Sequence, residues 1–158
     1  MTWVHDNIYA AGGTHIPSNW DAFADQTGVT GILHLAPERA ARFSGSSPEV
    51  FLWLNIADEN QAASSERLVA GRFLFECVTE GRRVLLHSSL GRHRTRWAFV
   101  SYLLFAGSSV RASLRQAAEL PWLSPYHTDT AAWEAFAETL KKCSSKPSLT
   151  TNHRATTL

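Results

Sequence analysis

One stretch decides the fold: residues 83–107 read RVLLHSSLGRHRTRWAFVSYLLFAG. The apolar run 84–86 is long enough for one buried strand, and the polar, glycine-containing segment 87–94 follows it as a tight turn. From Trp97 onward, apolar side chains recur every three or four residues, which predicts a helix. A strand, a tight loop and a helix N-terminus form an anion site, because the loop N–H groups and the positive end of the helix dipole converge on one point.

The rest of the chain alternates short apolar runs with helical patterns. Besides 84–86, the expected strands lie at residues 3–11, 29–35 and 50–56. Besides the helix after the turn, the expected helices lie at residues 19–27 with Ser18 as N-cap, 64–79, 109–120 and 128–142, and residues 37–48 form a loop. This alternation predicts an α/β sandwich with a mainly parallel central sheet flanked by helices.

Composition bounds the class of protein. The chain has 158 residues, of which 44% are hydrophobic, and residues 1–143 are expected to form one domain. Residues 144–158 are polar and rich in serine and threonine, and we expect a disordered tail. The net charge of +1 gives no overall field to attract nucleic acid. We expect a cytoplasmic monomer, because no signal segment or membrane span is visible.

Several residue types are assigned to the core or to the surface by their context. Cys77 lies in an apolar helical pattern, and neither it nor Cys143 belongs to a disulfide framework or metal-ligand spacing, so we expect no metal and no cofactor. The tryptophans expected to fill the core are Trp3, Trp20, Trp53, Trp122 and Trp133. The arginines expected on the surface are Arg82, Arg83, Arg96, Arg111 and Arg115.

The turn itself carries a family resemblance. Residues 87–95 read HSSLGRHRT, which resembles the phosphate loop of the cysteine-dependent protein tyrosine phosphatases, a histidine and cysteine followed by five residues, an arginine and a serine or threonine. Every diagnostic position matches except that Ser88 stands in place of the nucleophilic cysteine. The order of the flanking segments, roughly Ile8 to Leu140, is similar to that of the dual-specificity phosphatases. The resemblance implies their α/β sandwich and hydrolysis of phosphotyrosine, phosphoserine or phosphothreonine through a phosphocysteine.

Each part of the loop has an expected role. The guanidinium of Arg94 can hold two phosphate oxygens at once, and Gly91 permits the tight turn. The resemblance implies that His87 packs behind the loop and that Thr95 hydrogen-bonds the nucleophile, although Thr95 can also cap the following helix. The predicted phosphate-binding residues are Ser88, Ser89, Leu90, Gly91, Arg92, His93 and Arg94.

Asp58 is the predicted acid. It follows the expected strand 50–56, and in the related phosphatases an aspartate at a similar separation from the loop protonates the leaving group. The match of the segment 54–58 favours Asp58 over its neighbour Glu59. The alternative is that Asp58 only ends the strand in a turn.

Ser88 decides the expected activity. A cysteine in such a loop has a pKa of about 3.5–7.5 and is a thiolate at neutral pH, whereas a serine hydroxyl needs an adjacent general base. The side chain of His87 should point away from that of Ser88, and His93 is expected at the rim of the pocket. The resemblance implies that the catalytic residues are Ser88, Arg94, Asp58 and Thr95. With serine at position 88, we expect the loop to bind phosphate without turnover.

Two explanations of Ser88 stay open. A native serine makes the protein a pseudophosphatase, whereas an engineered Cys→Ser change makes it a substrate-trapping variant. Retention of Arg94, Thr95 and Asp58 favours the trap, and the lack of a purification tag favours a native serine. Expected partners are a phosphorylated protein or a small phosphomonoester. A phosphoinositide is the alternative, since some lipid-directed relatives carry a basic residue at the position of Arg92.

Overall fold

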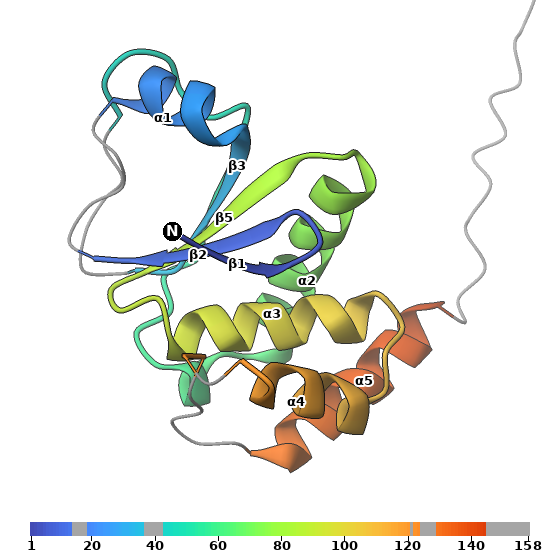
Figure 1. The fold of residues 1–158 in the computed structure, drawn as a ribbon. Helices are drawn as coiled ribbons and strands as arrows, with labels where there is room; N and C mark the ends of the chain where they lie inside the picture. The colour runs from blue at the N-terminus through green and yellow to red at the C-terminus, as the bar shows by residue number, and fades with distance from the viewer. Residues whose placement is uncertain (14–18, 37–42, 121, 124–128, 145–158) are drawn as a thin grey trace, which may run out of the picture.

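A five-stranded sheet lies at the centre of the protein, in the order β1-β2-β5-β3-β4 (Figure 1). The computed structural model describes residues 1–13, 19–36, 43–120, 122–123 and 129–144. Strand β1 pairs with β2 in the antiparallel sense, and all the other pairs are parallel. The strands are β1 (Thr2–His5), β2 (Ile8–Gly12), β3 (Val29–His34), β4 (Val50–Trp53) and β5 (Arg83–Ser88). The predicted mainly parallel sheet is confirmed.

Helices cover both faces of this sheet. Figure 1 shows α1 on one face and the other four α-helices on the opposite face. The helices are α1 (Trp20–Thr27), α2 (Ser64–Thr79), α3 (His93–Phe105), α4 (Val110–Ala118) and α5 (Thr130–Ser144), with a 3₁₀ turn η1 (Glu59–Gln61) before α2. Within the described residues, no helix has the length and apolar character needed to cross a membrane. The predicted α/β sandwich is confirmed.

The central strands are buried on both faces, which explains their continuous apolar sequence. In β5, Val84 and Leu86 join the larger apolar cluster beneath α2, α3 and α5, whereas Leu85 joins the smaller cluster beneath α1. In β3, Leu33 and Ile32 divide between the two clusters in the same way. Because side chains alternate along a strand, the last two residues of β5, His87 and Ser88, face opposite sides of the sheet.

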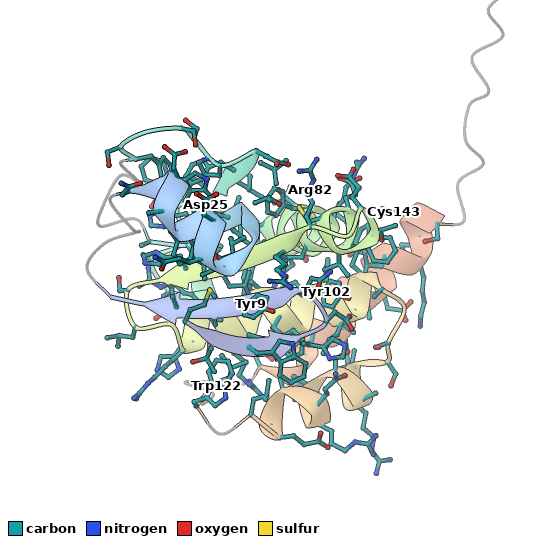
Figure 2. The ribbon with its side chains drawn as sticks, turned by 45° about the horizontal axis from the view of Figure 1, so that its top comes forward. Tyr9, Asp25, Arg82, Tyr102, Trp122 and Cys143 are labelled. Atoms are coloured by element: carbon teal, nitrogen blue, oxygen red, sulfur yellow. The ribbon has the colours of Figure 1, made fainter. Side chains whose placement is uncertain are left out.

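The prediction of one strand over residues 3–11 is wrong. The chain reverses between β1 and β2, and Asp6 adopts a left-handed conformation with φ 45°. Aspartate is one of the few residues other than glycine that tolerate this conformation. The Asp6 carboxylate accepts a hydrogen bond of 2.8 Å from the hydroxyl of Tyr102, which reaches from α3 to the hairpin (Figure 2). This distant partner holds the turn, and the local sequence pattern does not show it.

Several boundaries also differ from the prediction. Strand β4 ends at Trp53, not at residue 56, because the Ile56 N–H donates to the Leu54 carbonyl (3.0 Å) in a tight turn. Helix α1 begins at Trp20, and Asn19 caps it by accepting from the Ala22 N–H (3.1 Å). The predicted cap Ser18, residues 37–42 of the predicted loop and the predicted tail beyond Ser144 lie outside the described residues.

Three burial assignments are corrected, two for tryptophans expected in the core and one for an arginine expected on the surface. Trp20 and Trp133 are buried as predicted and Trp122 is half-buried, but Trp3 and Trp53 are 55% and 43% exposed. These two belong to β1 and β4, the edge strands of the sheet, where fewer neighbours cover a side chain. Arg96 was expected on the surface, but it is only 7% exposed. Its surroundings are described below.

Candidate functional site

The candidate site lies where the parallel strands end. Strands β2, β3, β4 and β5 run in the same direction, so their carboxyl ends meet at one edge of the sheet, the usual place for ligands in α/β folds. Strand β5 ends at Ser88 and α3 begins at His93, which leaves a loop of residues 89–92 (Figure 1). The first N–H groups of α3 and the loop amides therefore lie at this edge, as the sequence predicts.

Ser88 lies at the bottom of the loop and is 2% exposed. Its Oγ accepts a hydrogen bond from the Gly91 N–H (3.0 Å) and lies 3.2 Å from Oγ1 of Thr95. Thr95 is fully buried in the first turn of α3, and the N-cap of this helix is Arg92. Thr95 therefore contacts the residue at the nucleophile position, and its alternative role as the helix cap is wrong.

The loop backbone rests directly on the end of β2. Gly91 has φ 64°, and a Cβ atom there would lie 2.7 Å from the backbone nitrogen of Gly12. A Cβ atom at Gly12 would collide with the carbonyl group of Leu90. The Gly13 N–H also donates to the Ser89 carbonyl (2.8 Å). The sequence indicated the turn at Gly91, but it gave no sign that Gly12 leaves room for it.

Arg94 joins the loop to the ends of two other strands. Its Nη1 donates to the carbonyls of Leu35 (2.9 Å) and Ile56 (3.1 Å), which follow β3 and β4. These contacts orient the guanidinium at the carboxyl edge of the sheet, beside the segment that leads to Asp58. A planar guanidinium fixed in this way can present paired N–H groups to phosphate oxygens.

Asp58 and Glu59 differ sharply in their surroundings. Asp58 is half-buried, and its Oδ1 accepts from the Asn60 N–H (2.8 Å) as the N-cap of η1. Glu59 is only 8% exposed and lines a small cavity with Arg67 and Arg96. Of the two carboxylates, Asp58 is therefore the one with access to solvent, which is consistent with the acid that the sequence predicts.

His87 lies behind the loop, as the resemblance implies. It is 3% exposed, and its Nδ1 lies 3.1 Å from Nδ1 of His34, with the two rings stacked. Because neighbouring side chains of a strand point to opposite faces, His87 is directed away from the Ser88 hydroxyl. His34 is a partner that the sequence analysis missed, since it becomes apparent only from the pairing of β3 with β5.

The remaining predicted loop residues lie toward the solvent. Leu90 is 72% exposed and Arg92 is exposed, whereas Ser89 and His93 are half-buried. Arg92 therefore lies at the outer rim of the loop, next to the first turn of α3. A cation in this position is available to a second anionic group of a ligand.

Neither cysteine replaces the missing nucleophile. Burial raises the pKa of the Cys77 thiol to about 11, so Cys77 is protonated at neutral pH, and its side chain belongs to the apolar core. Cys143 is exposed near the C-terminal end of α5 (Figure 2). Both cysteines lie on helices, away from the loop that follows Ser88.

Comparisons of sequence give no relative. No protein-family profile matches the chain, and no curated protein is significantly similar to it. The likeness to known proteins is therefore one of structure alone.

Solved structures match nearly the whole chain. Human DUSP28 superimposes with a TM-score of 0.72 at 14% identity, over 90% of this chain and 99% of that one. PTPMT1 in complex with PI(5)P gives 0.72 at 13% identity, over 90% and 97%. The human tyrosine phosphatase-like serine/threonine/tyrosine-interacting protein gives 0.63 at 14% identity, over 91% and 95%. The chain has the α/β fold of the dual-specificity phosphatases.

Proposed function

We propose that this protein is a phosphate-recognition domain of the dual-specificity phosphatase type, which binds phosphate monoesters without hydrolysing them. The observation that carries the proposal is the arrangement around Ser88. Its hydroxyl accepts from the Gly91 amide and contacts Thr95, so the loop is folded around the position of the nucleophile. Arg94, in the first turn of α3, is anchored to the carbonyls that follow β3 and β4.

The absence of turnover follows from the chemistry of the hydroxyl. A loop of amides and a nearby guanidinium can ionise a thiol, but a serine needs a general base to remove its proton. His87 points to the opposite face of the sheet and is paired with His34. The pocket therefore retains the means to bind a phosphoryl group and lacks the means to attack it.

The ligand class proposed for this site is a phosphomonoester, either a phosphorylated protein or a small molecule. The loop recognises the phosphoryl group, which phosphotyrosine, phosphoserine and phosphothreonine share. A phosphoinositide is the second candidate, because Arg92 is exposed at the rim and can bind a second phosphate. PTPMT1, one of the structural neighbours, was solved with PI(5)P bound.

The test is a calorimetric titration with inorganic phosphate and with phosphotyrosine. Replacing Arg94 by lysine is expected to weaken binding by about 10- to 100-fold, because lysine keeps the charge but loses the paired N–H groups, and charged hydrogen bonds contribute about 1.5–3 kcal/mol. The matched control is Arg111→Lys on α4, an exposed arginine outside the site, which should bind as the native chain does. Equal affinity of all three proteins, each with a native melting temperature, contradicts the proposal.

A further inference from the structure

A group of buried charges lies between four elements behind the candidate site. Glu59 of η1, Arg67 of α2 and Arg96 of α3 are 8%, 7% and 7% exposed, and we call these three residues the buried charge cluster. They line a cavity of about 20 Å³, which has room for one water molecule. Trp133 of α5 lines the same cavity, and the guanidinium of Arg67 lies 4.8 Å from the centre of its ring.

The charges of this cluster depend on one another. Burial lowers the pKa of both Arg67 and Arg96. The negative charge of Glu59 opposes this shift on Arg96, and on Arg67 it does so together with Asp129 and Glu66, which act more strongly. A buried ion pair contributes little net stability compared with an apolar replacement, but removal of one partner leaves the other charge buried and uncompensated. Glu59 and the two arginines line the same cavity, so a change in one of them alters the surroundings of the other two.

The cluster links the turn of Asp58 to helix α3, which carries Arg94 and Thr95. Glu59 directly follows Asp58 and begins the turn that Asp58 caps. Arg96 lies on α3 two residues after Arg94 and one after Thr95, and η1 contacts α3. A shift of Glu59 would therefore move the turn of Asp58 relative to the helix that carries the phosphate-binding arginine.

We propose that Glu59 is a positioning residue, whose buried side chain lines the same cavity as Arg67 and Arg96 and fixes the turn of Asp58 against α3. The part of this inference that concerns acid catalysis rests on the proposed function, since it takes Asp58 as the acid of the cysteine-containing form. The anchoring itself is a property of the turn and can be measured in the native chain.

The first experiment measures amide hydrogen exchange at Asn60, whose N–H donates to the Asp58 carboxylate. In Glu59→Gln, which removes the charge and keeps the shape, exchange at Asn60 should be at least about tenfold faster, because the turn opens more often. The control is Glu134→Gln, an exposed glutamate of α5, which should leave this rate unchanged. Arg96→Lys serves the same purpose if Glu59→Gln does not fold. Unchanged exchange in the cluster variants overturns the proposal.

The second experiment separates positioning from a general effect on stability. In the Ser88→Cys background, Glu59→Gln should lower kcat on phenyl phosphate about tenfold and have little effect on 4-nitrophenyl phosphate, whose leaving group needs little protonation. Added to Asp58→Asn, it should cause no further loss, because both changes remove the same function. Fully additive losses overturn the proposal. A folded Ser88→Cys chain without turnover would mean that the loop is not a catalytic frame, and the exchange rate at Asn60 then decides the role of Glu59.

Discussion

Replacing Ser88 by cysteine is expected to make the chain an active phosphatase. The hydroxyl of Ser88 already accepts from the Gly91 amide and contacts Thr95, so a sulfur at this position meets the same donors, which stabilise a thiolate. The gain should span several orders of magnitude, comparable to the loss of about 10⁶-fold when the nucleophile of a hydrolase is removed. Hydrolysis of 4-nitrophenyl phosphate, with the pre-steady-state burst recorded, measures it.

The matched control is Ser89→Cys, which places the same thiol one residue further along the loop. Ser89 is half-buried and its carbonyl is used by the Gly13 amide, so a cysteine there should give no burst. A folded Ser88→Cys protein without activity would mean that the loop is not a catalytic frame. Turnover by the chain with Ser88 in place would also contradict the mechanism, because it would show that a thiol is not required.

Replacing Asp58 by asparagine in the Ser88→Cys chain is expected to lower kcat by about 10²–10⁴-fold on substrates with poor leaving groups, the usual contribution of a general acid. The amide can still accept from the Asn60 N–H, so the turn should stay intact while the proton is lost. Initial rates on phenyl phosphate and on 4-nitrophenyl phosphate, whose leaving group needs little protonation, check this effect.

The control for this variant is Asp25→Asn, an exposed aspartate on α1 (Figure 2). It changes the net charge equally and should leave the rate on phenyl phosphate unchanged. If Asp58→Asn loses less than about tenfold in kcat on this substrate, then Asp58 only caps η1 and another group supplies the proton.

The local features of this protein could be predicted from its sequence. The strand that ends at Ser88, the glycine turn and the helix that starts near His93 are encoded in contiguous residues, and hydrophobic periodicity together with one motif predicts them. The alternation of strands and helices was sufficient for the α/β class. The position of Asp58 on a turn after β4 also follows from the linear order.

The features that were missed depend on contacts between distant segments. The turn at Asp6 is held by Tyr102, and the buried Arg96 lines a cavity with Glu59 and Arg67 from two other elements. Arginine side chains are mostly exposed, and the residues around Arg96 show only that it lies in a helix. The local sequence therefore does not distinguish a buried arginine from an exposed one. The close approach of Gly12 to the loop depends on the pairing of β2 with β5.

The central claim is that the loop of Ser88 to Arg94 binds a phosphoryl group through its backbone amides. The most direct measurement follows the amide ¹H and ¹⁵N chemical shifts of the native chain during titration with inorganic phosphate. We expect chemical-shift changes that saturate and fit a single binding site, and that are largest at Ser89, Gly91, His93 and Arg94. These changes should be lost in the Arg94→Lys variant. Shifts that are absent, or that concentrate on amides away from this loop, would contradict it.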